Sequence, residues 1–182
     1  MALKKESYYA IEALTFLCKH GEDIPWTVEE ITIILTLNWE VKEKLNKLKE
    51  DCSAEDIKKT IKEVQNEGIK IRDKNTIRKA LNQLKVSNFI LTLTRSGTHI
   101  THAGRNATLY QILKLFEHVK LTSCTQNPKS FDCPREKIGK CVTYKFYDEI
   151  GVFLKKILEK ITVKDLIEKK CDIKEIIKSI GD

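Results

Sequence analysis

Apolar residues recur every three to four positions over most of the chain, which is the spacing of helices that bury one face. This spacing predicts a first helix over residues 5–19. Two later stretches open on Thr27 followed by Glu30 and on Ser53 followed by Asp56. Each pair is typical of a helix start, because the first side chain can cap amides of the next turn and an acid suits that turn. We therefore expect a mainly α-helical protein.

Two predicted helices stand in tandem in the middle of the chain, over residues 53–68 and 74–85. Asp73 or Asn75 can cap the second of them. The apolar positions of this second helix lie on one face, and the other face carries Lys74, Arg78, Lys79, Asn82 and Gln83. Such a pair is typical of a helix-turn-helix, whose second helix enters the major groove of DNA.

A β-hairpin is expected directly after this pair. The apolar and β-branched run 89–94 and the run 99–102 are separated by a short turn at 95–98. This arrangement places Arg95 and His99 near the tip of the hairpin. A helix-turn-helix followed by a basic hairpin is the order of a winged helix.

The rest of the chain combines a cysteine-containing loop with a long amphipathic helix. Further helix starts are predicted at Thr108 and at Thr162 with Asp165. Residues 122–143 are expected to form a loop, and a helix over 144–161 carries a broad apolar stripe. That stripe fits packing on its own domain and a dimer interface equally well.

These elements predict two regions. Residues 1–107 are expected to form a winged helix-turn-helix DNA-binding domain, in which 22–52 is an extra helical insertion. Residues 108–182 are expected to supply the cysteine loop and the dimerisation helices.

The chain carries 33 basic and 26 acidic residues, and the whole excess of positive charge lies in one segment. Residues 70–105 contain eight basic residues and a single acid, Asp73, so the rest of the chain is neutral overall. A solvated lysine-rich face is the alternative, since most charge runs have that explanation. Segregation of the entire excess favours a polyanion, and together with the winged helix it predicts double-stranded DNA as the partner. The predicted DNA contacts are Lys70, Arg72, Lys74, Asn75, Thr76, Arg78, Lys79, Asn82, Arg95, Ser96, Thr98 and His99.

Composition narrows the class of protein further. With 7 Gly and 3 Pro, the chain has few residues for tight turns. No run approaches the roughly 18 apolar residues of a membrane span, and the first residues lack the apolar core of a secretory leader. We therefore expect a cytoplasmic protein without membrane contact. The sequence contains no phosphate-binding glycine loop, no paired His ligands at helical spacing and no nucleophile motif, so we do not expect an enzyme.

Several of these pieces, taken in order, resemble the winged-helix transcriptional regulators of the IscR and NsrR type, which include iron-sulfur sensors. The resemblance is carried by YAIEAL at 9–14, IRKALNQLK at 77–85, TLYQIL at 108–113 and ITVKDL at 161–166, with a three-cysteine loop and a long helix before the last. It implies a homodimer that binds a palindromic operator, with a cluster in the three-cysteine loop that adjusts DNA affinity. The chain departs from this family in the insertion at 22–52, in a wing without a glycine-rich tip, and in longer spacings between the cysteines.

Cys124, Cys133 and Cys141 fall within 18 residues of the predicted loop. Thiolates are soft ligands, so the three cysteines predict an iron-sulfur cluster, with zinc as the alternative. Buried free thiols or a disulfide would also account for them. The candidates for a fourth ligand are Glu6, His118 and Cys171.

The sequence thus predicts a homodimeric DNA-binding transcriptional regulator that senses redox state or iron-sulfur status through a cysteine-ligated cluster. Two alternatives stay open. One is a winged-helix regulator without metal, in which the cysteine loop is structural. The other is a cysteine-based redox or electron-transfer protein, which would leave the basic segment unexplained.

Overall fold

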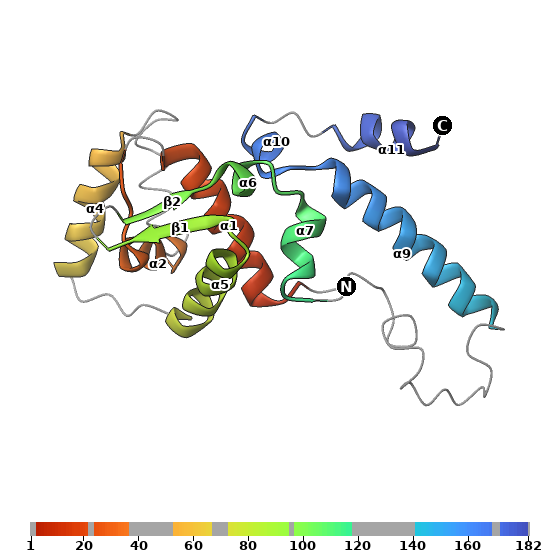
Figure 1. Cartoon of the computed structure of the whole chain (residues 1–182), viewed down its shortest axis with the longest axis horizontal. Coiled ribbons are helices and arrows are strands. Elements are labelled where there is room, and N and C mark those ends of the chain that lie inside the picture. Colours follow the sequence, from red (N-terminus) through yellow and green to blue (C-terminus); the bar gives the residue numbers. More distant parts are fainter. Residues whose placement is uncertain are drawn as a thin grey trace.

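The computed structural model of the chain describes residues 3–21, 24–36, 53–66, 73–94, 97–117, 141–168 and 172–181. Helices make up most of this structure, together with a two-stranded antiparallel hairpin (Figure 1), so the mainly α fold predicted from the sequence is confirmed. The elements in chain order are α1 (Lys5–His20), α2 (Val28–Thr36), α4 (Ala54–Asn66), α5 (Lys74–Val86), β1 (Ile90–Leu93), β2 (Gly97–Ile100), α6 (His102–Arg105), α7 (Leu109–Lys114), α9 (Val142–Lys160), α10 (Val163–Ile167) and α11 (Ile173–Gly181).

Several helices start where the local sequence predicts. At the start of α2, the Glu30 amide donates to Thr27 Oγ1 at 3.1 Å, and the Thr27 amide donates to the Glu30 carboxylate at 2.7 Å. The same reciprocal arrangement precedes α4, α7 and α10, at Ser53 with Asp56, Thr108 with Gln111 and Thr162 with Asp165. Each arrangement satisfies amides that a helix leaves without an internal partner, and a cap of this kind contributes about 1 kcal/mol.

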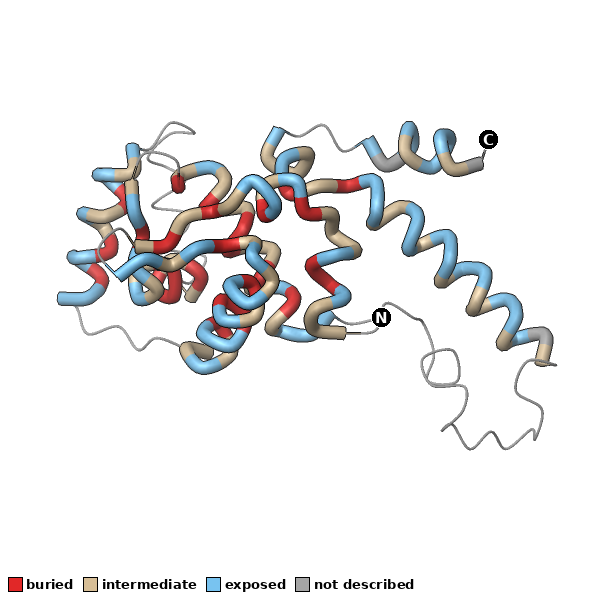
Figure 2. Tube along the Cα trace, in the orientation of Figure 1, coloured by how far each residue is buried: buried red, intermediate tan, exposed pale blue. Residues whose placement is uncertain are grey.

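Helix α1 lies at the centre of the core. Its inner face is fully buried and includes Ala10 and Ala13, whose small side chains let neighbouring helices approach closely. Helices α2, α5, α7 and α10 all pack against it. Figure 2 shows the buried positions concentrated in this body and along the hairpin. From α5 the core receives Ile77, Ala80, Leu81 and Leu84.

The packing corrects the predicted helix-turn-helix pair. The sequence order pairs residues 53–68 with residues 74–85, but α5 packs mainly against α1 and α2. Helix α4 packs against α2 instead, at the left edge of the molecule in Figure 1. Helix α2 buries Ile31, Ile33 and Leu35. The order of helices along the chain could not reveal this pairing, because adjacency in sequence does not determine which apolar faces meet.

The hairpin packs on the core through one face. Its register pairs Ile90 with Ile100 and Leu93 with Gly97, and the two isoleucines are buried. The backbone at Trp26 adds a further bridge, in which the Thr98 amide donates to the Trp26 carbonyl oxygen at 2.7 Å. The hairpin predicted from the sequence is therefore present, with its second strand at Gly97–Ile100 instead of the predicted 99–102, and it is anchored to the segment before α2.

The C-terminal helices attach to this body through a short backbone ladder. The Val163 amide donates to the Ala107 carbonyl at 3.0 Å, and the Leu109 amide donates to the Ile161 carbonyl at 2.8 Å. Helix α9 runs diagonally away from the body, and Figure 2 shows tan and blue along its length. It begins at Val142, two residues before the predicted start, so the loop predicted to reach residue 143 ends earlier. Among the described helices, none has the length and apolar character needed to cross a membrane.

Candidate nucleic-acid interface

Helix α5 divides its residues between a buried face and a basic, amide-bearing face. Arg78, Lys79 and Asn82 are exposed on the outer side, as is Asn75 near the N-terminal end. The predicted contacts Lys74 and Thr76 are half-buried. No acidic residue occurs within α5, so all the charged side chains of this helix are basic. The opposite face is locked into the core, which fixes the orientation of these side chains.

The other predicted contacts have different positions. Thr98 is fully buried and its Oγ1 lies 3.2 Å from Oγ1 of Thr92, so it is unable to reach DNA. The strand alternation explains this correction, because Thr98 belongs to the inward-facing set of the hairpin. His99 is half-buried and opposite Leu91. Four predicted contacts lie outside the described residues, namely Lys70, Arg72, Arg95 and Ser96.

Arg105, the last basic residue of the charged segment, lies away from the α5 face. It is on α6, where it lines a hollow of about 320 Å³ together with His102 and Lys164. The positive charge of the segment is therefore distributed over more than one element of the fold.

The N-terminal end of α5 is fixed by Asp73, the single acid of the basic segment. Asp73 has a left-handed backbone, with φ of 54°, and its side chain makes no capping bond to α5. The predicted capping role of Asp73 is therefore wrong, and Asn75 lies inside the helix. The carboxylate instead accepts a hydrogen bond from Tyr9 Oη at 3.0 Å and from Lys5 Nζ at 3.2 Å.

This contact changes the chemistry of Tyr9. Burial, followed by the hydrogen bond to the Asp73 carboxylate, raises the pKa of Tyr9 to about 12. A phenol is protonated at neutral pH in any case, and the raised pKa extends this donor form of Tyr9 into alkaline solution. Nothing in the sequence pattern predicts this role for Tyr9 or for Lys5, although their spacing of four residues places them on one face of α1.

Helix α4 braces the hairpin through the Pro25–Trp26 segment. Lys58 Nζ donates to the Pro25 carbonyl at 2.9 Å and lies 5.3 Å from the centre of the Trp26 ring. Gly97 sits against the same segment with a positive φ of 71°, and a Cβ there would lie 2.9 Å from Pro25 Cβ. Helix α4 thus supports the segment to which the hairpin is bonded.

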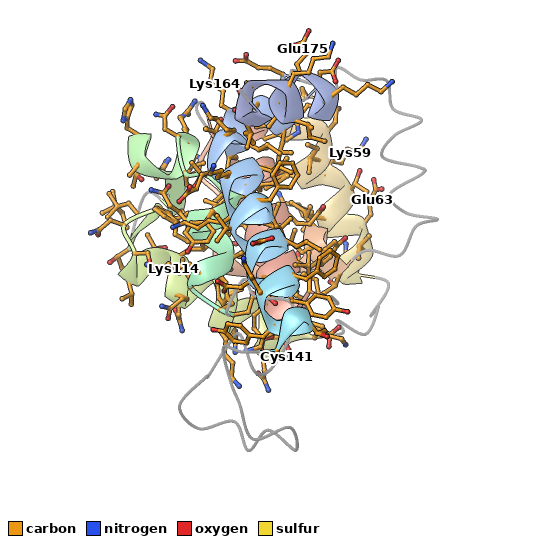
Figure 3. All side chains as sticks on the ribbon, turned by 90° about the vertical axis from the view of Figure 1, so that its right-hand side faces the viewer. Lys59, Glu63, Lys114, Cys141, Lys164 and Glu175 are labelled. Atoms are coloured by element: carbon orange, nitrogen blue, oxygen red, sulfur yellow. The ribbon has the colours of Figure 1, made fainter. Side chains whose placement is uncertain are left out.

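Of the three cysteines predicted to bind metal, one lies within the described residues. Cys141 is half-buried at the N-terminus of α9, at the end of that helix remote from α10 and α11 (Figure 3). Cys124 and Cys133 lie outside the described residues, as do His118 and Cys171. Within the described ranges, no three His, Cys, Asp or Glu side chains are gathered so as to hold a metal ion. Cys18, by contrast, packs partly buried against the core, as the sequence predicts.

Comparison with known proteins identifies the fold. No protein-family profile matches the chain, and no curated protein matches it in sequence. The chain is similar in structure to IscR of T. potens, with a TM-score of 0.53 and 12% identity over 95% of this chain and 90% of that one. It is also similar to CymR (YrzC), the global cysteine regulator of B. subtilis, with a TM-score of 0.54 and 11% identity over 92% of this chain and 97% of that one. The resemblance predicted from the sequence is therefore confirmed at the level of fold, and the chain has the winged-helix fold of the IscR and CymR regulators.

Proposed function

We propose that this protein is a DNA-binding transcriptional regulator, without catalytic activity, that reads duplex DNA with α5. The observation that carries the proposal is the outer face of α5, where Arg78, Lys79 and Asn82 are exposed on a helix whose opposite face is buried. Arginine and lysine bond the acceptor edge of guanine, and asparagine bonds adenine, so these are side chains that read bases in the major groove. Similarity to two regulators of the same fold supports the assignment.

The beginning of α5 supports the same orientation. The Asp73 carboxylate points to α1 and leaves the first amides of α5 without a side-chain cap from that residue. Those amides carry the positive end of the helix dipole, which favours a phosphate group nearby. Lys74 and Asn75 flank this end of the helix. In this proposal, phosphate contacts at the start of α5 set its register, and the exposed outer face reads the sequence.

We further propose that the functional unit is a homodimer. Residues 1–107 would form the DNA-binding domain and residues 108–182 the dimerisation region. Phe146, Ile150 and Phe153 are 55%, 36% and 40% exposed, and their spacing places them on one face of α9. No residue of α9 whose side chain is described is fully buried, so this helix offers apolar area to a second copy. A two-fold pair of winged helices also doubles the contact area with DNA.

The sensing element that we propose is a cysteine-ligated centre held by Cys124, Cys133 and Cys141. Such a centre, as an iron-sulfur cluster, would supply a redox-sensitive group whose state changes the geometry of the dimer. The resemblance to the IscR and NsrR type and the clustering of three thiols in the sequence support this part. The test of this part must distinguish an iron-sulfur cluster from bound zinc and from cysteines that hold no metal.

The DNA-binding proposal is tested with duplexes that the wild-type protein selects from a random-sequence pool. Replacing Arg78 and Lys79 with Ala should weaken binding at least tenfold. It should also lower the slope of log K against log salt by about one for each of the two side chains that contacts a phosphate. The matched control is Lys174→Ala with Lys178→Ala, which removes the same charge from exposed positions on α11, far from α5 in Figure 1. Equal losses of DNA affinity in the two variants would show that α5 contributes only to the net positive charge. Selection of no duplex by the wild type would refute the proposed function.

The dimer and the centre have independent readouts. Ile150→Glu with Phe153→Glu places two charges in the proposed dimer interface, so light scattering should report a monomer, while circular dichroism should show unchanged helix content.

Protein purified without oxygen should show visible absorption and contain iron and sulfide, and Cys141→Ala should abolish this absorption. Stoichiometric zinc, or colourless protein after anaerobic reconstitution, would remove the cluster from the proposal and leave the winged helix in place.

A further inference from the structure

The first two turns of α1 fasten the beginning of helix α5. Lys5 and Tyr9 stand four residues apart and therefore share a face of α1. Both reach the Asp73 carboxylate, which lies 3.2 Å from Lys5 Nζ and 3.0 Å from Tyr9 Oη. Asp73 is the residue immediately before α5, and its left-handed backbone turns the chain into that helix. This contact is therefore a direct mechanical link between α1 and the start of α5.

A different face of the same two turns holds the end of the α7 segment. Lys4 Nζ donates to the Phe116 carbonyl at 2.8 Å, and Ser7 Oγ donates to the Glu117 carboxylate at 2.5 Å. Ser7 is fully buried, so its hydroxyl depends on Glu117 for a partner outside α1. In the sequence, Glu117 stands just before the predicted cysteine loop.

The part of α1 that follows these contacts is packed into the core. Ala10, Ala13, Leu14 and Leu17 are fully buried and pack among neighbouring helices, so α1 shifts as a unit rather than by bending. A displacement applied at one face of its first turns must therefore appear at the other face.

We propose that the first two turns of α1 act as a relay that couples the position of the chain at residues 116–117 to the position of the reading helix α5. Tyr9 and Asp73 are the positioning residues of this relay on the α5 side, and Ser7 with Glu117 forms its other end. The relay deepens the proposed function and rests on it for its DNA readout. In this arrangement the charge of Asp73, the single acid in the basic segment, is directed to Lys5 and Tyr9.

The test is a double-mutant cycle between Ser7→Ala and Tyr9→Phe. Each substitution removes one hydroxyl and keeps the rest of the side chain close to its original shape. Tyr9→Phe should weaken binding to the selected duplex by about three- to tenfold, and Ser7→Ala should change it by about threefold in the Tyr9 background. In the Tyr9→Phe background, Ser7→Ala should have a clearly smaller effect, because of the two side-chain contacts to Asp73 only the one from the exposed Lys5 remains. Equal effects of Ser7→Ala in both backgrounds would overturn the relay.

A second readout needs no DNA. Hydrogen exchange at the Ile77 amide, which donates to the Asp73 carbonyl oxygen at 3.0 Å, and at the amides that follow it in α5 should speed up in Ser7→Ala and in Tyr9→Phe, and the effect in the double variant should be clearly less than the sum of the two single effects. Tyr8→Phe is the matched control, since it removes a hydroxyl from the exposed neighbour on α1 and should leave these amides unchanged. Additive exchange effects would refute the relay. If the wild type selects no duplex but the exchange effects are coupled, the proposed function fails while the relay stands.

Discussion

Trp26 joins three parts of the fold, and its replacement by Phe tests that role. The indole is fully buried, and its Nε1 donates to the His20 carbonyl at 2.9 Å. Its ring meets Phe16 edge-on, with the ring centres 4.9 Å apart, and lies under the Lys58 ammonium. Trp26→Phe keeps an aromatic ring but removes the hydrogen-bond donor and leaves a small void.

The cost can be worked from these contacts. Loss of the Nε1 hydrogen bond costs about 1 kcal/mol, with the His20 carbonyl left to find another partner. The smaller ring adds roughly 1 to 1.5 kcal/mol for lost burial and residual cavity. A total of roughly 2 to 2.5 kcal/mol lowers the melting temperature by roughly 4 to 10 °C in a chain of this size.

Urea unfolding followed by far-ultraviolet circular dichroism measures this cost without relying on tryptophan fluorescence. The midpoint should fall while the slope m is unchanged, because the surface exposed on unfolding is nearly the same. DNA affinity of the folded variant should stay within about twofold of the wild type, since the bond from the Thr98 amide uses the backbone of Trp26. A loss below about 0.5 kcal/mol, the range of a surface substitution, would show that the indole does not hold these elements together.

Three further substitutions test the packing and the titrating groups. Gly104→Ala should destabilise the protein by about 2 kcal/mol, because its Cβ would overlap the Phe89 carbonyl oxygen; an increase in stability, as expected for alanine in an open helix, would contradict the packing. Burial, followed by the nearby Lys19 charge, lowers the pKa of His20 below its ordinary 6.5, so its contribution to stability is complete above pH 6.5 and is lost as pH falls through the lowered value. The free energy of unfolding should therefore drop less between pH 7.5 and 5.0 in His20→Phe than in the wild type, and equal drops would remove this assignment. The raised pKa of Tyr9, about 12, gives stability that is present below pH 10 and is lost as pH rises toward 12, so base titration of unfolding should be shallower over that window in Tyr9→Phe, and identical titrations would contradict it.

The helix caps and the hairpin of this protein can be predicted from short stretches of its sequence. The starts at Thr27, Ser53 and Thr162 all have the predicted capping partner, and the start predicted at Thr108 is capped together with Gln111. The reason is that a cap forms between residues three positions apart, so the chain carries the whole interaction within one turn. The hairpin is predictable for a similar reason, since its two strands are joined by a short turn.

The candidate interface is predictable only in part. The basic outer face of α5 follows from helical periodicity, which separates Ile77, Ala80 and Leu84 from Arg78 and Lys79. The burial of Thr98 could not be predicted in this way. It follows from the hairpin register and from the bridge to Trp26, and neither can be read from the sequence around Thr98.

The sequence by itself determined the helical class, the caps, the hairpin and the side of α5 that bears the positive charge, because each depends on residues within a turn or two of one another. Only the tertiary structure decided that α5 packs mainly against α1 and α2, that α4 braces the hairpin through Lys58, and that Asp73 bonds to Tyr9 instead of capping its own helix. These outcomes join residues tens of positions apart. They depend on which apolar faces fit together when the chain collapses, and a carboxylate such as Asp73 takes the partner that this packing brings within reach.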